Sequence, residues 1–145
     1  MNKHYLVIAA FTALTGCTDA VVGEWESDDN TSSTQDNLSI DSDGTGLRTA
    51  TDNGTAGGQN YSLMVEYEMK WELVNDNAYE FVLNCDDAEV KVEGQKMASG
   101  CTGVAAFFNI TFSKLEADCS INDDGDVLKC DPEGSDDKIK YNRKD

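Results

Sequence analysis

The sequence is poor in the residues on which most catalytic and metal sites depend. Its only histidine is His4 and its only proline is Pro132. No GxSxG motif and no CxxC pair occurs, which argues against a serine nucleophile elbow and a cysteine zinc site. Paired carboxylates such as Asp86-Asp87 have no base, nucleophile or oxyanion donor beside them in sequence. We therefore predict no catalytic residues, no metal ligands, no cofactor and no enzyme activity.

Positive charge is also scarce. The chain has 11 Lys and Arg against 28 Asp and Glu, which gives a formal net charge of −17 at pH 7. Nucleic acids and anionic lipids are negatively charged and would be repelled by such a surface. We expect no nucleic-acid partner, and the composition does not identify a protein partner.

Long hydrophobic runs are absent after the N-terminus. Lys3 precedes an apolar run from Tyr5 to Leu14, and this run of about ten residues fits a secretory signal but is too short to span a bilayer. We therefore expect residues 1–16 to be a cleaved signal peptide and residues 17–21 to be a tether. Residues 22–145 are expected to form one domain.

The end of this signal carries a recognisable motif. Leu14-Thr15-Gly16-Cys17 resembles the lipobox of bacterial lipoproteins, which implies that Cys17 is lipidated and becomes the first mature residue. Thr18 follows, where the inner-membrane retention signal of such proteins has Asp. The resemblance therefore implies a lipid-anchored protein of the outer membrane, whose membrane contact is made through the lipid. An ordinary cleaved signal with an incidental cysteine is the alternative.

Alternation of apolar and polar residues predicts an all-β fold. Apolar side chains occupy every second position from Leu63 to Leu73 and again from Tyr79 to Cys85, which predicts two strands around a three-residue loop at 75–77. This hairpin would place three pairs on its apolar face: Leu73 opposite Tyr79, Trp71 opposite Phe81, and Met69 opposite Leu83.

Two Asp-Gly turns predict further hairpins. Asp43-Gly44 would set Ile40 opposite Leu47, and Asp124-Gly125 would set Ile121 opposite Leu128. Other alternations predict strands at 22–26, 88–92, 108–112, 115–121 and 139–143, with either a turn or a bulge at 113–114. Segments 49–61 and 94–103 are predicted as loops, and Pro132 is predicted to lie outside every strand. No segment after the signal shows the 3.6-residue period of a helix.

Four cysteines follow Cys17, and an even number in an exported domain predicts two disulfides. The hairpin at Asp124-Gly125 sets Cys119 directly opposite Cys130, at a separation that a disulfide can close. Cys85 and Cys101 then pair by elimination.

Eight to ten strands with mostly short connections favour an antiparallel up-and-down β-barrel, with a β-sandwich as the alternative. Gly23-x-Trp25 resembles the opening signature of lipocalins and related calycins, and the run Leu38–Gly46 and the Trp71 strand are similar to bacterial lipocalin-like lipoproteins. This resemblance implies that Trp25 plugs the closed end of a lipocalin-like barrel. It also implies that Arg143, with Lys140 as the substitute, packs over the indole.

Two functions remain open at this point. The interior of an eight-stranded barrel is just wide enough to be filled by side chains or to hold one small ligand. The chain is then either a binding module for a small apolar ligand or a structural or surface-interaction lipoprotein with a solid barrel. The side chains expected to line a ligand pocket are Tyr67, Met69, Trp71, Tyr79, Phe81 and Phe108.

Overall fold

The computed structural model describes residues 19–108, 114–133, 136 and 138–145. Its elements are β1 (Gly23–Ser27), β2 (Thr34–Ile40), β3 (Thr45–Ala56), β4 (Gln59–Asn75), β5 (Ala78–Asn84), the 3₁₀ turn η1 (Cys85–Asp87), β6 (Glu89–Val92), β7 (Gln95–Ser99), α1 (Gly100–Phe108), β8 (Lys114–Ile121), β9 (Val127–Pro132) and β10 (Ile139–Arg143). The prediction for residues 109–112 and for Ser113 lies outside the described residues.

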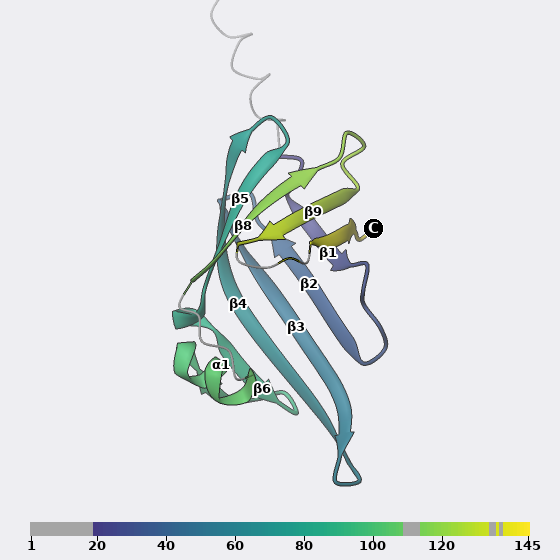
Figure 1. The fold of residues 1–145 in the computed structure, drawn as a ribbon, viewed down its shortest axis with the longest axis vertical. Helices are drawn as coiled ribbons and strands as arrows, with labels where there is room; N and C mark the ends of the chain where they lie inside the picture. Colours follow the sequence, from purple (N-terminus) through teal and green to yellow (C-terminus); the bar gives the residue numbers. More distant parts are fainter. Residues whose placement is uncertain (1–18, 109–113, 134–135, 137) are drawn as a thin grey trace, which may run out of the picture.

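Eight of these strands close into an antiparallel barrel (Figure 1). The hydrogen-bonded order is β3-β2-β1-β10-β9-β8-β5-β4, and β4 also pairs with β3. Apart from an insertion between β5 and β8, each strand lies beside its neighbour in sequence, and the first strand lies beside the last. The up-and-down barrel predicted from the sequence is confirmed, and closure excludes the sandwich.

The core follows from the period of two in the strands. Side chains at alternate positions point into the barrel, so each strand contributes every second residue to one apolar interior. Among the described residues, the largest side chains with almost no exposed surface are Trp25, Tyr141, Leu128, Val21, Val65, Val90 and Val104.

The β4–β5 hairpin has the predicted register but a different turn. Leu73 lies opposite Tyr79, Trp71 opposite Phe81 and Met69 opposite Leu83. Asn75 pairs with Ala78, however, so the loop has two residues and a bulge lies between Leu73 and Asn75. The prediction of a three-residue loop was wrong because the bulge takes up the extra residue. Leu73 is 48 % exposed, because β4 continues past the end of the core.

Residues 49–61, predicted as a loop, belong to the longest hairpin of the molecule. β3 and β4 pair without interruption from Thr45 opposite Lys70 to Ala56 opposite Gln59. Gly57 and Gly58 form the turn with φ of 59° and 81°, which suits the left-handed positions of a type I′ turn. The loop prediction was wrong because it relied on apolar alternation, whereas this pairing depends on the Gly-Gly turn and on backbone hydrogen bonds.

The end of this hairpin projects beyond the barrel (Figure 1). The pairing of β2 with β3 ends at Asp52, and the pairing of β6 with β4 ends at Leu63. Residues 54–61, which we call the arm, therefore have only each other as strand partners among the described residues. Tyr61 lies over Gly54, where a Cβ atom would come within 2.5 Å of its hydroxyl oxygen.

The insertion of β6, β7 and α1 packs against the inner face at the open end of the barrel. Val65 of β4 lies opposite Val90 of β6, and Val90 lies opposite Ala98 of β7, so all three face the same way. A Cβ atom on Gly103 of α1 would lie 2.9 Å from Ala98 Cβ, which puts the helix on that face. The loop predicted at 94–103 and the strand predicted at Phe108 were both wrong, as was the absence of a helix.

Two smaller predictions also fail for local reasons. Ile40 lies opposite Gly46 and not Leu47, because the β2–β3 turn has one residue more than expected. Asp43 Oδ1 accepts hydrogen bonds from the backbone N–H and hydroxyl of Thr45, at 2.9 and 2.6 Å, and Gly44 has a φ of 88°.

The prediction that Pro132 lies outside every strand was also wrong. Pro132 is the last residue of β9 and lies opposite Ala117 of β8. Its nitrogen points away from β8 at this position, so the missing N–H costs no hydrogen bond between the two strands.

Candidate functional site

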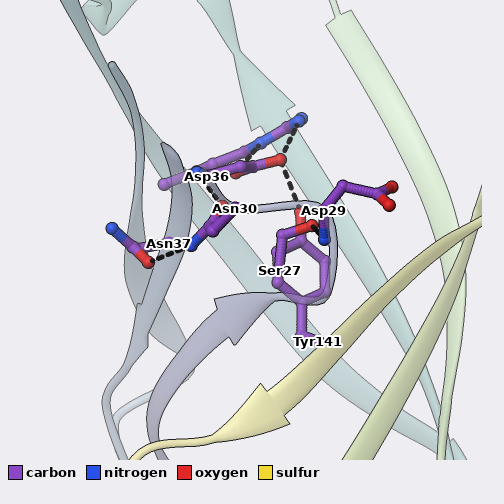
Figure 2. Close-up of polar contacts among 7 residues, drawn as sticks. Ser27, Asp29, Asn30, Asp36, Asn37 and Tyr141 are labelled. Carbon is purple, nitrogen blue, oxygen red and sulfur yellow. Dashed lines mark hydrogen bonds and ion pairs between the residues drawn. The ribbon is translucent and has the colours of Figure 1, made fainter. Parts of the chain in front are cut away.

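A hydrogen-bonded ion pair lies among the inward-facing side chains of the barrel (Figure 2). Asp36 of β2 accepts hydrogen bonds from Nε and Nη2 of Arg48 on β3, at 3.0 and 2.7 Å. Tyr141 of β10 donates its hydroxyl to the same carboxylate at 3.0 Å. Both oxygens of Asp36 are therefore engaged by charged or neutral donors from two other strands. We call Asp36, Arg48 and Tyr141 the interior polar cluster.

The protonation states of Arg48 and Tyr141 are set by burial and by neighbouring charges. Burial alone would lower the pKa of Arg48, but hydrogen bonding to Asp36 and the charge of Asp36 outweigh it and raise this pKa. Burial raises the pKa of Tyr141 well above its ordinary value, and Asp36 adds to the rise while Arg48 opposes it. Burial also raises the pKa of nearby Tyr67. At neutral pH the guanidinium stays charged and both phenols stay neutral, so none of these three groups is suited to proton transfer.

The loop between β1 and β2 is hydrogen-bonded to β2 beside the interior polar cluster (Figure 2). Asn30 Oδ1 accepts a hydrogen bond from the backbone N–H of Asp36 at 2.7 Å, and Asn30 Nδ2 donates to Asn37 Oδ1 at 3.1 Å. At the start of the loop, the backbone N–H of Asp29 donates to Ser27 Oγ at 3.2 Å. These contacts hold the rim of the barrel against β2, which favours a fixed rather than an adaptable opening.

Five of the six residues predicted to line a ligand pocket converge inside the barrel. Tyr67, Met69, Trp71, Tyr79 and Phe81 are all buried. The rings of Trp71 and Tyr79 meet edge to face, with centroids 5.8 Å apart. The indole N–H of Trp71 is shared between the backbone carbonyls of Asp41 and Thr45, at 2.9 and 3.1 Å. The sixth residue, Phe108, ends α1, and its side chain lies outside the described part of the chain.

These side chains leave little space. The cavity between them and the interior polar cluster has a volume of about 20 Å³, and Arg48, Met69, Phe81, Leu83 and Tyr141 contribute to its wall. A buried water needs at least about 10–15 Å³, whereas pockets for small molecules usually measure about 300–1,000 Å³. This cavity therefore has room for about one water and not for a fatty acid.

The closed end of the barrel carries the predicted contact between Trp25 and Arg143. The guanidinium carbon of Arg143 lies 4.3 Å from the centroid of the Trp25 ring. Arg143 Nη1 donates to the carbonyl of Val22 at 2.9 Å, Nε donates to Gly125 O at 2.7 Å, and Nη2 donates to Ala20 O. Lys140, the predicted substitute, instead forms an ion pair with Asp28 at 2.8 Å.

The residues around this contact explain the Gly-x-Trp pattern. A Cβ atom on Gly23 would lie 2.6 Å from Arg143 Nη1, so a larger residue would displace the guanidinium. The indole N–H of Trp25 donates to Val21 O at 2.9 Å, and both side chains are fully buried. Gly23 makes room for the cation, and Trp25 and Val21 close the end of the barrel.

Both predicted disulfides are confirmed. Cys119 and Cys130 lie directly opposite each other with their Cα atoms 4.1 Å apart, and the bond cross-links β8 to β9. Cys85 joins Cys101 with a Cα separation of 4.7 Å and so ties α1 to η1. Cys85, Asp86 and Cys101 also lie close enough together to suggest a metal site, because their sulfur and carboxylate oxygen atoms are all within 4.8 Å of one another. Because both sulfurs belong to the disulfide, neither offers the thiolate that a metal would need.

Two grooves outside the barrel are polar, whereas a third, of about 460 Å³, has a mixed lining that includes Leu47, Met69 and Val82. One groove of about 380 Å³ is lined by Glu80, Asp118 and Asp131, and the strand register places these carboxylates side by side on β5, β8 and β9. Another of about 440 Å³ is lined by polar residues that include Asn30, Asn37 and Asn142. Neither lining suits an apolar ligand.

Sequence reasoning missed the interior polar cluster. Arg48 lies directly opposite Leu38, and Asp36 lies two residues before Leu38 on the same strand, so all three share the inner face. The signal was present, because Asp36 is in phase with Leu38 and Ile40. It was overlooked because this hairpin was predicted from its apolar residues alone, and Asp36 and Arg48 are charged.

Comparisons of this chain with protein-family models, curated proteins and solved structures gave no match. Within the described residues, no helix is long and apolar enough to cross a membrane. The function has to be inferred from the residues and geometry of the chain itself.

Proposed function

We propose that this chain is a non-enzymatic, lipid-anchored protein of the outer membrane, whose lipocalin-like barrel is a solid structural or surface-interaction module. The observation that carries this proposal is the small cavity among the described inward-facing side chains, whose volume of about 20 Å³ is far below that of a ligand pocket. In this reading the aromatic side chains and the interior polar cluster hold the barrel together rather than bind a ligand.

The polar groups inside the barrel support a structural role. Arg48 and Tyr141 are both engaged by Asp36, and no buried side-chain nitrogen or oxygen of the described residues lacks a hydrogen-bond partner. A ligand-binding or catalytic site normally keeps at least one polar group free for its substrate. The raised pKa of Tyr141 also argues against acid–base chemistry near neutral pH.

The lipid anchor is supported by the sequence around Cys17, and the burial of Val21 places the start of the folded domain close to it. Leu14-Thr15-Gly16-Cys17 matches a lipobox, and Thr18 favours the outer membrane. Val21, which was expected to belong to the tether 17–21, is buried at the closed end and belongs to the domain, so a tether from Cys17 would be short. Lipid chains attached to Cys17 would bury many CH₂ groups and give stable attachment.

The contact between Trp25 and Arg143 supports the calycin-like part of the proposal. The Gly23-x-Trp25 pattern and the distant Arg143 meet as that resemblance implies. Other closed barrels could contain such a pair, so this contact supports a family relationship only together with the strand order and the lipobox.

Membrane attachment can be tested with Cys17→Ala. The wild-type protein should fractionate with the outer membrane and carry lipid by mass spectrometry, whereas the variant should remain unprocessed or appear as a soluble form. If the variant still fractionates with the outer membrane and keeps its mobility, the anchor lies elsewhere.

The solid barrel can be tested with fatty acids and hydrophobic dyes. A filled interior should give no saturable change in the fluorescence of Trp25 and Trp71 with any member of the panel. Saturable quenching at micromolar ligand would instead establish the alternative function, a binding module for a small apolar ligand.

A further inference from the structure

The tip of the β4–β5 hairpin exposes two neighbouring apolar side chains. Leu73 is 48 % exposed and Val74 is 62 % exposed. Among the described residues, Met97 on β7 is the only other large apolar side chain that is exposed, at 60 %. Two such residues side by side mark a place where another apolar phase could cover the surface.

The shape of the hairpin explains why the core cannot cover this pair. The pairing of β3 with β4 begins at Thr45 opposite Lys70, so residues after Lys70 extend past the end of β3. The bulge between Leu73 and Asn75 then removes Val74 from the alternation. Leu73 and Val74 therefore lie past the end of β3, next to the β4–β5 turn.

Residues 19–22 lie at this same end of the barrel. Tyr79, directly opposite Leu73, has its phenol hydrogen-bonded to the backbone of Val21, and its pKa is raised by burial and further by Asp19 nearby. Arg143 holds the carbonyls of Ala20 and Val22. Residues 19–22 are therefore fixed across the closed end, close to the β4–β5 turn.

The proposed lipid anchor would lie within a short reach of the tip. Cys17 precedes Asp19 by two residues, which span at most about 7 Å when fully extended. A lipid on Cys17 would therefore bring the membrane surface to the closed end of the barrel. This step rests on the lipidation proposed above.

We propose that Leu73 and Val74 form a second, non-covalent membrane contact, which seats the closed end of the barrel on a zwitterionic bilayer surface. Glu72 and Asp76 flank the pair, and Asp123 and Asp124 lie in the neighbouring β8–β9 turn. These carboxylates make anionic lipids unfavourable, whereas a neutral headgroup layer accepts the apolar pair without repulsion.

This contact would fix the orientation of the whole molecule. The arm, residues 54–61, lies at the opposite end of the structure from the turn between β4 and β5 (Figure 1). With the tip on the bilayer, the arm and the β6–β7–α1 insertion point away from the membrane. A single flexible tether would leave the barrel free to tumble, so the second contact gives the anchored protein a defined outer face.

The experiment uses the lipidated full-length protein on phosphatidylcholine vesicles that contain a nitroxide-labelled lipid. Val74→Trp and Met97→Trp are the matched variants, because the two positions are equally exposed and lie at different ends. The wild type provides the background from Trp25 and Trp71. We expect the added tryptophan at position 74 to be quenched several-fold more strongly than the one at position 97. Replacing part of the phosphatidylcholine with phosphatidylglycerol should weaken the quenching at position 74.

Flotation of the same vesicles separates the two proposals. If the wild type floats with the vesicles but positions 74 and 97 are quenched equally, the tip contact is wrong and the lipid anchor stands. If the wild type does not float, lipid anchoring fails and the tip contact fails with it. Stronger quenching at position 74 on anionic vesicles would overturn the preference for a zwitterionic surface.

Leu73→Ser combined with Val74→Ser should fold and float normally but lose protection of the tip amides from hydrogen exchange on vesicles.

Discussion

The closed end of the barrel and the arm are held by different kinds of contact. At the closed end, Arg143 reaches carbonyls of Ala20 and Val22, more than 120 positions earlier in the chain, and stacks on Trp25. The arm depends on the local pairing of residues 54–56 with residues 59–61 and on the Gly57-Gly58 turn. The first region can form only when the barrel is complete, whereas the second needs only its own hairpin. We therefore expect damage at the closed end to be global and damage in the arm to stay local.

The largest effect is expected from Arg143→Ala. The change removes a cation–π contact and three hydrogen bonds to carbonyls, one of them to Gly125, and should lower the free energy of unfolding by about 2–4 kcal/mol. Chemical denaturation followed by tryptophan emission measures this loss. Lys140→Ala is the control, because its ion pair with Asp28 is exposed to solvent and should contribute little to stability.

A double-mutant cycle of Arg143→Ala with Trp25→Phe measures how far the two side chains depend on each other. A coupling energy indistinguishable from zero would show that the stacked geometry does not stabilise the fold, and would remove the main support for the calycin-like reading. The closed end would then resemble the arm in depending on backbone pairing alone.

The interior polar cluster lies between these two regions. Asp36→Ala tests whether damage to this cluster destabilises the whole barrel, as at the closed end, or stays local, as in the arm. The variant leaves the charge of Arg48 without its partner in a largely buried site, which should cost about 3 kcal/mol. Replacing both partners, as in Asp36→Leu with Arg48→Met, should recover most of this loss, because no buried charge then remains unpaired. Denaturation midpoints of the two variants provide the measurement. Equal midpoints would mean that the cost comes from lost packing and not from the unpaired charge.

Alkaline pH should weaken the same cluster through Tyr141. Folding raises the pKa of this phenol above the value of about 10 expected for an unfolded chain, so the folded state holds the proton more tightly. The contribution of this raised pKa to the free energy of unfolding is fully present below about pH 10 and is lost as the pH rises toward the pKa of Tyr141 in the folded state. Tyr141→Phe should cost about 1 kcal/mol at pH 8 and should flatten the alkaline decline. Tyr61→Phe in the arm is the control. If stability falls with pH as steeply in Tyr141→Phe as in the wild type, Tyr141 is not the group whose ionisation weakens the fold.

The same contrast explains which parts of the fold could be predicted from the sequence. Apolar alternation predicts strands whose side chains fill the core, and so the registers at Trp71–Phe81 and Cys119–Cys130 were predicted correctly. The pairing of Trp25 with Arg143 was also predicted, from a resemblance and not from periodicity. These residues meet because the barrel closes, and no local pattern carries that information.

The failures share another cause. The arm, β7 and α1 are stabilised by glycine turns, by backbone pairing and by the Cys85–Cys101 disulfide, none of which produces a regular apolar pattern. Asp36 and Arg48 were missed because a paired charge on an inner face looks like a polar loop residue in the sequence. Their burial becomes favourable only when β2 and β3 bring the two side chains together.

The smallest global effect is expected in the arm, from Gly57→Val. A β-branched residue at a φ of 59° is strained by about 1–2 kcal/mol, so the turn should open more often. Because residues 54–61 pair only with each other among the described residues, this opening should speed hydrogen exchange of the arm amides by about tenfold and leave the unfolding midpoint nearly unchanged. Gly57→Asn is the matched control, since Asn accepts the left-handed conformation of a type I′ turn and should behave like the wild type. If Gly57→Val instead lowers the midpoint as much as Arg143→Ala, the arm belongs to the cooperative unit of the barrel, and the proposed difference between the two regions is wrong.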